Sequence, residues 1–123
     1  MNTKANFLET SNSLLKMELS HYWNGHGSAI FLEFGQLTER HKRDGSPANP
    51  EGKITLCIEW SWRVENETTI LCGSWSEENL WQPTFDALIG KKLKQVRLFA
   101  RLPEIELVFE NGYRLLSFAT SDG

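Results

Sequence analysis

The chain has 123 residues, of which 40% are hydrophobic, 11% aromatic and 24% charged, and its formal net charge is −3. This composition excludes the low-hydrophobicity class of disordered chain, and the length fits a single globular domain over residues 1–123. The acidic balance argues against non-specific nucleic-acid binding, which needs a face that neutralises phosphates.

The sequence carries no sign of a membrane or secretory segment. No apolar run approaches the roughly 18 to 20 residues of a membrane span. The N-terminal stretch MNTKANFLETSNSLL does not join a basic segment to an apolar one, as a secretory signal does. We therefore expect a cytoplasmic protein with no membrane partner, in a compartment that keeps thiols reduced.

Two strands are expected in the N-terminal third, whereas residues 1–13 fit either a short helix or a frayed tail. Alternating apolar residues predict a strand within 28–35, and 14–23 is expected to supply its neighbour. A similar apolar spacing recurs over 93–109. This spacing fits an internal duplication of a strand pair. It fits equally two unrelated β-hairpins, because every strand has the same two-residue side-chain period.

Residues 36–53 are predicted to form a long polar loop. The segment contains an Asp44-Gly45 pair and two prolines, and it lacks an apolar periodicity. Loops longer than about 12 residues are usually functional or disordered.

A buried strand is predicted over 54–64, ITLCIEWSWRV. Its side chains alternate between a core face and an opposite face. The core face is expected to hold Ile54, Leu56, Ile58, Trp60, Trp62 and Val64.

Both cysteines of the chain lie in or beside this strand and its return over 70–75. With a three-residue turn, Cys72 joins the tryptophan face opposite Trp60, and Cys57 points away. With a two-residue turn, the cysteines share a face but lie too far apart along the ladder for a disulfide. Both arrangements predict buried or half-buried thiols that are not bridged and act as small hydrophobic residues.

One helix is predicted over 82–89, QPTFDALI, after an earlier turn near Ser76. Pro83 suits its first turn, and Gly90 suits a left-handed C-terminal cap. The apolar stripe that must hold this short helix consists of Phe85, Leu88 and Ile89.

The C-terminal third is predicted to contain three strands. Residues 91–103 are predicted to form an irregular strand, with a bulge or with apolar neighbours on both faces. Asn111-Gly112 then predicts a two-residue type I′ turn between two alternating runs. The expected register pairs Glu110 with Tyr113, Leu107 with Leu116, and Ile105 with Phe118.

Together these elements predict an α+β fold, mostly antiparallel β, with six to seven strands and one principal short helix. The order along the chain is two strands, the long loop, two strands, the helix and three strands. The sheet is expected to curl, as in a half-barrel. The core is expected to form around Trp60, Trp62, Phe85, Leu107 and Phe118.

No motif in the chain identifies an enzyme or a cofactor site. The sequence lacks a Gly-x-Ser-x-Gly elbow and a glycine-rich phosphate loop, so we expect no catalytic residue and no cofactor, although an enzyme stays open. His21, His26 and His41 lack the spacing of a zinc site, so no metal is expected. Glu104 and Glu106 fit the wet face of a sheet better than a pair of acid–base groups.

Aromatic and arginine side chains near predicted turns are the candidate interface, because these residue types anchor protein contacts. The alternative is that the aromatic residues cap the ends of the core. Two basic clusters, near 40–43 and 91–101, also resemble single-strand binding sites, but the acidic total disfavours nucleic acid. The candidate interface residues are Tyr22, Trp23, Arg40, Arg43, Trp75 and Trp81.

Four segments resemble a family of small uncharacterised bacterial proteins: AIFLEFGQL, ITLCIEWSWRVE, ILCGSW and LFARLPEIELVFENGYRLLSF. Some members lie beside toxin genes and are suspected immunity proteins. The resemblance covers most of the chain after residue 14 and implies a non-catalytic inhibitor of a bacterial toxin. It carries no functional residues.

Two functions therefore stay open. The first is a protein-binding module, of which an immunity-type inhibitor is one form, and an acidic inhibitor would be steered towards a basic toxin. The second is a small-ligand or enzymatic domain with a pocket at one end of the sheet, on which Glu59, Arg63 or His21 would converge. An exposed edge strand would also be compatible with a homodimer.

Overall fold

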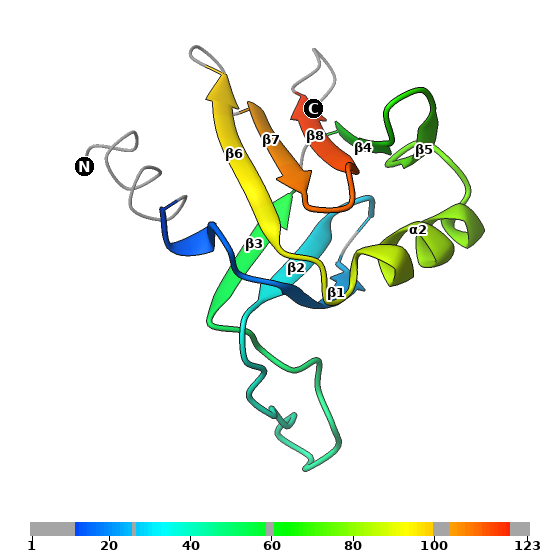
Figure 1. Cartoon of the computed structure of the whole chain (residues 1–123). Helices are drawn as coiled ribbons and strands as arrows, with labels where there is room; N and C mark the ends of the chain where they lie inside the picture. Colours follow the sequence, from blue (N-terminus) through cyan, green and yellow to red (C-terminus); the bar gives the residue numbers. More distant parts are fainter. Residues whose placement is uncertain (1–11, 26, 59–60, 100–103, 119–123) are drawn as a thin grey trace.

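The structure is a computed structural model and describes residues 12–25, 27–58, 61–99 and 104–118. Within these residues the fold is α+β, with eight strands in two antiparallel sheets that are not closed into a barrel (Figure 1). The strand count differs from the expected six to seven because the predicted strand 54–64 is two strands. The three-stranded sheet has the order β1 (Leu19–Asn24), β2 (Ile30–Phe34) and β3 (Ile54–Ile58).

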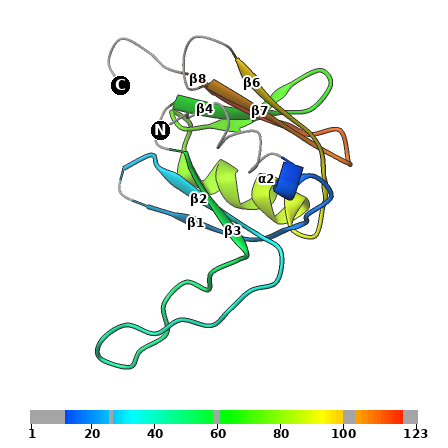
Figure 2. The same ribbon diagram turned by 90° about the vertical axis from the view of Figure 1, so that its left-hand side faces the viewer.

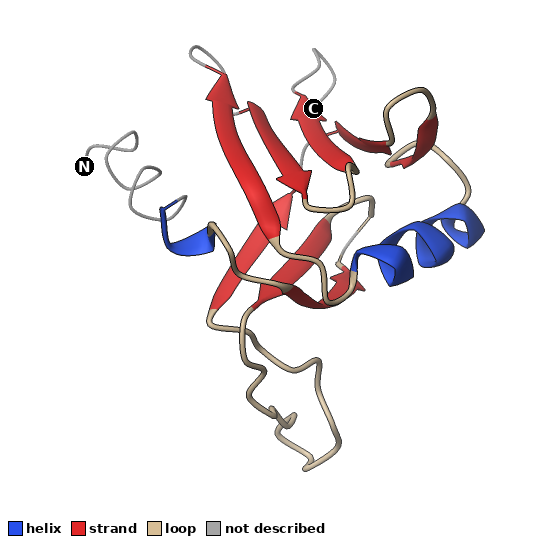
Figure 3. Ribbon diagram, viewed as in Figure 1, coloured by secondary structure: helices blue, strands red, loops and turns tan. Residues whose placement is uncertain are grey.

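The five-stranded sheet has the order β5-β4-β8-β7-β6. Its strands are β4 (Ser61–Glu65), β5 (Ile70–Gly73), β6 (Leu93–Phe99), β7 (Glu104–Phe109) and β8 (Arg114–Phe118). A 3-10 turn, η1 (Glu78–Leu80), leads into the helix α2 (Trp81–Leu88) (Figure 3). The two sheets face one another, and α2 lies between them (Figure 2).

The helix joins the two sheets through one core side chain. The ring of Phe85 stacks on Tyr22 of β1 with centroids 4.9 Å apart, and its edge meets Trp62 of β4 at 5.6 Å. Phe85 is completely buried, and Trp62 is 1% exposed. Burying a ring of this size stabilises the fold by about 2 to 3 kcal/mol, so this contact is a main link between the sheets.

The predicted helix is confirmed, with a small shift of its buried stripe. It begins at Trp81, and its buried residues are Trp81, Thr84, Phe85 and Leu88. Ile89 is the C-terminal cap residue and is 39% exposed. Gly90 follows with φ +85°, the left-handed conformation that glycine adopts without strain.

The predicted strand 54–64 changes sheet within its length. Its first part, β3, belongs to the three-stranded sheet and its second part, β4, to the five-stranded sheet. The predicted alternation is still confirmed, because Ile58, Trp62 and Val64 are buried and Cys57 is exposed. Trp60 lies outside the described residues. Alternation sorts inside from outside in each strand, but it does not reveal where a chain passes from one sheet to another.

The predicted register of the C-terminal hairpin is wrong by one residue. Leu107 pairs with Leu115, and Phe109 N–H donates to the carbonyl of Tyr113 at 2.9 Å. The turn therefore has three residues, and Gly112 has φ +90°. A type I′ turn needs positive φ at residue 111 as well, and residue 111 does not have it. In consequence Leu115 is a core residue and Leu116 lies on the opposite face.

The predicted irregularity of the strand after residue 93 is confirmed as a bulge between Leu93 and Gln95. The hairpin of β1 and β2 has a matching bulge between Leu19 and His21. Leu19 pairs with Phe34 as Leu93 pairs with Phe109, so the two hairpins share one register.

The long loop 36–53 is an irregular two-stranded arm. Isolated bridges join Thr38 to Glu51 and His41 to Pro47. The arm extends away from both sheets (Figure 1). Its base is fixed by Glu33, which is 2% exposed and accepts hydrogen bonds from Trp23 Nε1 at 2.8 Å and Gly52 N at 3.1 Å, and one from Thr55 Oγ1.

Candidate functional site

The edge of the five-stranded sheet carries an open depression beside β5. Its volume is about 410 Å³. We call it the β5 depression, and it is lined by Trp62, Arg63, Ile70, Leu71, Cys72, Gly73, Trp75, Ser76 and Leu80.

Large exposed apolar side chains surround this depression. Trp75 is 79% exposed, Ile70 62% and Leu80 47%, and these are the three most exposed large hydrophobic side chains in the described part of the chain. Scattered exposed hydrophobic residues are normal on a protein surface, but a contiguous group marks an interaction site. The β5 depression is therefore the clearest docking feature of the described surface.

The turn after β5 holds Trp75 in a defined position. The indole Nε1 of Trp75 donates to Oγ of Ser61 at 3.1 Å. The carbonyl of Gly73 accepts hydrogen bonds from Trp81 Nε1 at 2.9 Å and from Ser76 Oγ at 2.7 Å. A Cβ at Gly73 would lie 2.9 Å from the carbonyl oxygen of Trp62, so this close approach needs glycine. Trp75 is thus both exposed and partly preorganised.

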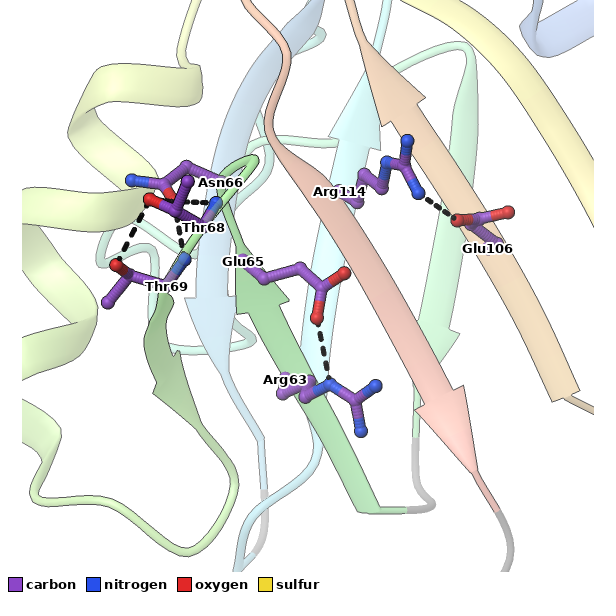
Figure 4. A network of polar contacts seen from close by, with 7 residues as sticks. All are labelled: Arg63, Glu65, Asn66, Thr68, Thr69, Glu106 and Arg114. Atoms are coloured by element: carbon purple, nitrogen blue, oxygen red, sulfur yellow. Dashed lines mark hydrogen bonds and ion pairs between the residues drawn. The ribbon is translucent and has the colours of Figure 1, made fainter.

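The turn between β4 and β5 is also fixed by side-chain hydrogen bonds. Oδ1 of Asn66 accepts from Thr68 N at 2.9 Å and from Thr69 N at 2.8 Å (Figure 4). Asn66 N–H donates to the carbonyl of Thr69 at 2.9 Å. This Asx-type turn sets the start of β5 and so the position of Ile70.

A band of charged residues crosses the outer face of the same sheet, the face opposite the core. We call it the charged face; it consists of Arg63, Glu65, Gln95, Arg97, Glu104, Glu106 and Arg114, with Val108 and Leu116 between them. The strand pairing places Arg63 beside Leu116, Leu116 beside Glu106 and Glu106 beside Arg97. These residues form a line from β4 to β6. Arg63 also lines the β5 depression, so the two features are continuous.

Glu106 is the centre of the ion pairs on the charged face. Its two oxygens lie 3.5 Å from Arg97 Nε and 3.6 Å from an NH group of Arg114 (Figure 4 shows the second pair). Arg63 Nε forms a shorter pair with Glu65 at 3.1 Å. The side chains of Arg97 and Arg114 are 55% and 51% exposed, whereas that of Glu106 is 6% exposed. The carboxylate therefore lies beneath the guanidinium groups.

The six predicted interface residues do not form one site. Tyr22 lies on the core side of β1, stacks on Phe85 and donates from its hydroxyl to Asp86 at 3.4 Å. Partial burial, followed by the negative charge of Asp86, raises the pKa of Tyr22 above 10.0. Trp23, also on β1, lies on the outer face of the three-stranded sheet, where it stacks on Phe31 with centroids 3.9 Å apart.

The predicted arginines lie on the arm, and one predicted tryptophan is in the core. Arg40 pairs with Glu51 at 3.6 Å, and Arg43 is exposed near the tip of the arm. Trp81 is 6% exposed and packs edge-on against Trp62 at 5.0 Å, so its indole caps the core and does not reach the surface as an anchor. Among the six, Trp75 alone lines the β5 depression.

Sequence reasoning missed the residues that surround Trp75. Ile70 read as part of an ordinary strand, because the sequence does not show that β5 is an edge strand. Alternation assigns each arginine to a face of its own strand. The order of strands in the sheet then brings Arg63, Arg97 and Arg114 to one common face. The sequence did contain one signal for that face: Glu106 stands between the apolar Ile105 and Leu107, which places its side chain on the face opposite the core.

The structure places Cys57 exposed and Cys72 buried, and neither is in a disulfide. Cys72 lies on the core face opposite Val64, not opposite Trp60, because the turn holds the four residues 66–69 and a bulge separates the Glu65–Ile70 pair from the Val64–Cys72 pair. Burial raises the pKa of the Cys72 thiol above 9.0, although a hydrogen bond with Thr84 opposes this. A buried thiol of this kind is a poor nucleophile.

The groups named as candidates for chemistry are dispersed. His21 lies on the three-stranded sheet with Nε2 3.1 Å from Asn49 Oδ1, far from the arginines in the strand order. Glu59 and His26 lie outside the described residues. In the described ranges no group of three or more histidine, cysteine or acidic residues is arranged to hold a metal ion.

Neither a protein-family model, nor a curated protein, nor a solved structure matches this chain. Of the helices that the structure describes, none has the length and apolar character needed to cross a membrane.

Proposed function

We propose that this chain is a non-catalytic protein-binding module whose partner docks on the β5 depression. The observation that carries the proposal is the exposure of Trp75, Ile70 and Leu80 around one depression at a sheet edge. Tryptophan is among the residues that most often dominate binding energy, and the surrounding apolar side chains would exclude water from it.

The form of this function that we favour is inhibition by occlusion, with a bacterial toxin as the partner class to test first. The support for a toxin is the resemblance of the strand segments to small bacterial proteins of the suspected immunity type. The net charge of −3 is compatible with electrostatic steering towards a basic partner. An inhibitor of this kind needs a surface and not a reaction centre. A cytoplasmic location fits this role.

A small-ligand or enzymatic role has weaker support. The small-ligand hypothesis predicts a pocket at one end of a curved sheet. The two sheets are instead open, and the β5 depression lies at the outer edge of one of them. Arg63 and His21, which would converge on such a pocket, belong to different sheets. A shallow apolar surface beside an edge strand suits a protein partner better than an enclosed small molecule.

The proposal is tested by capture, followed by reconstitution with the identified partner in purified form. Trp75→Ser and Ile70→Thr are the test variants. Leu37→Ser is the matched control, because Leu37 is also a partly exposed hydrophobic residue, at 38%, but belongs to the arm. We expect each test variant to weaken the purified complex at least about tenfold, which corresponds to about 1.4 kcal/mol.

The control should bind like the wild type. Equal binding by all four proteins would refute docking at the β5 depression. A small molecule that raises the melting temperature and whose effect is lost in the same two variants, with no protein complex, would favour the second function instead.

A further inference from the structure

In the ion pairs of the charged face, the arginines lie outward and the carboxylates inward. The face holds three arginines and three glutamates, so its formal charges balance. The exposed fractions within its ion pairs do not balance, because the arginine side chains are 39% to 55% exposed, whereas Glu65 is 25% and Glu106 6% exposed. Because the guanidinium groups cover the carboxylate of Glu106, a partner that approaches these ion pairs makes direct contact mainly with guanidinium groups.

Glu106 also fixes where those guanidinium groups lie. It accepts ion pairs from Arg97 on β6 and Arg114 on β8, one through each oxygen. Gln95 gives Arg97 a further contact, with its Oε1 3.2 Å from an NH group of Arg97. Each guanidinium group has five N–H donors in a fixed planar arrangement. One ion pair therefore does not use all five N–H groups. Preorganised side chains lose less entropy when they bind.

We infer that the charged face is a recognition site for an acidic segment of the protein partner, whose carboxylates pair with Arg97, Arg114 and Arg63. The inference rests on the proposed function, since it names the chemistry of the same partner. Arg63 connects the two parts, because it belongs to the charged face and also lines the β5 depression. The partner segment therefore combines acidic residues with an apolar side chain that reaches Trp75.

An acidic protein segment fits this surface better than a nucleic acid does. A nucleic-acid site needs a broad cationic surface, and here carboxylates alternate with arginines in a chain of net charge −3. Carboxylates match the guanidinium fork in paired geometry, and an extended segment laid across β4, β8, β7 and β6 would meet an arginine on three of these four strands. The net charge of the whole molecule steers a basic toxin over long range, which is a separate effect. At the charged face itself, the partner needs an acidic segment.

The decisive probe is a pair of synthetic peptides that share one leucine, flanked by glutamates in the first and by glutamines in the second. The reporters are the Nε–H signals of Arg63, Arg97 and Arg114 and the indole Nε1–H signal of Trp75 in the isotopically labelled full chain. We expect the glutamate peptide to shift these signals, with a dissociation constant about tenfold lower than that of the glutamine peptide. Inorganic phosphate and a single-stranded oligonucleotide at equal ionic strength test the other anions.

Variants confirm the site without relying on the peptide alone. Arg97→Lys keeps the charge beside Glu106 but removes the fork, and it should weaken glutamate-peptide binding severalfold while the fold persists. Arg40→Lys is the matched control, because Arg40 is 58% exposed and also pairs with a glutamate, but on the arm. It should not change binding.

The inference is overturned if the glutamate and glutamine peptides shift the arginine signals equally, or if the signals do not move. It is also overturned if the oligonucleotide or phosphate moves them at lower concentration than the glutamate peptide. These results differ from a failure of the proposed function, which would appear as a complex that Trp75→Ser and Ile70→Thr do not weaken. A partner that needs Trp75 but not the arginines would leave the proposed function intact.

Discussion

The indole Nε1 of Trp75 donates a hydrogen bond of 3.1 Å to Oγ of Ser61, so the most exposed large apolar side chain of the described surface is tied to a buried serine. Ser61 is 6% exposed and lies on the outer face of β4. A single tie of this kind limits the rotamers of the indole without covering it. It gives the β5 depression a defined wall on the side of the charged face.

Replacing Ser61 by alanine should loosen Trp75 with little effect on folding. The hydrogen bond that is lost involves a mostly exposed indole, so we expect a fall of about 0.5 to 1.5 kcal/mol in the free energy of unfolding. The indole N–H of Trp75 should exchange faster with solvent, which nuclear magnetic resonance measures directly. An unchanged exchange rate would mean that packing, and not Ser61, positions the ring.

The buried carboxylate of Glu106 should contribute more to stability than the outer carboxylate of Glu65. We expect Glu106→Gln to lower the free energy of unfolding by about 1 to 3 kcal/mol, because Glu106 is almost fully buried between two arginines. Glu65→Gln is the comparison, and its exposed pair should cost at most about 1 kcal/mol. Urea denaturation of both variants measures the difference, and equal midpoints would contradict it.

The arm should depend on Glu33, which ties its base to the three-stranded sheet. In Glu33→Gln the side-chain NH2 group would face a donor, either Gly52 N or Trp23 Nε1, because these two donors bind different oxygens of Glu33. We expect a loss of about 1 to 3 kcal/mol and faster hydrogen exchange at Gly52. Glu39→Gln, on the exposed part of the arm, should change neither. Slow exchange at Gly52 in Glu33→Gln would show that the arm is held in another way.

The two cysteines should differ in reactivity. Cys57 is exposed, whereas Cys72 is 2% exposed and burial raises the pKa of its thiol above the ordinary value of 9.0. A thiol reagent at neutral pH should therefore modify Cys57 in the folded protein and Cys72 only after unfolding. Cys57→Ser isolates the second thiol, and its rapid labelling in the native state would contradict the burial of Cys72.

The same pKa predicts how stability depends on pH. The folded state favours the neutral thiol of Cys72, so this contribution is present in full below about pH 9 and is lost as the pH rises through the raised pKa. The wild type should lose more stability above this pH than Cys72→Ala does. Parallel curves of unfolding free energy against pH for the two proteins would show that Cys72 does not ionise differently on folding.

Much of the fold follows from local patterns in the sequence. Alternation identified the buried faces of several strands, although not that of β8, and Pro83 and Gly90 bounded the helix because each has a restricted backbone role. The C-terminal hairpin was also expected, but Asn111-Gly112 is compatible with two turn lengths. The choice between them depends on a long-range contact, since Glu110 bonds through its backbone N–H to the carbonyl of Lys92.

The candidate site was less visible in the sequence, for a related reason. Trp75 could be named because a tryptophan near a turn is unusual, but Ile70 and Leu80 look like ordinary core residues. The exposure of Ile70 goes with the position of β5 at the edge of the sheet, which is a property of strand order, and Leu80 lies in η1, outside the strands. The charged face depends on the same order, since Arg63, Arg97 and Arg114 come from β4, β6 and β8.

The measurement that tests the central claim most directly is amide hydrogen exchange of the chain with and without its purified partner. If the partner docks on the β5 depression, binding should slow exchange over residues 70–80 and leave the arm, 36–53, unchanged. Slower exchange confined to the arm or to the outer face of the three-stranded sheet would place the partner elsewhere. That result would contradict the account given for Trp75 and its neighbours.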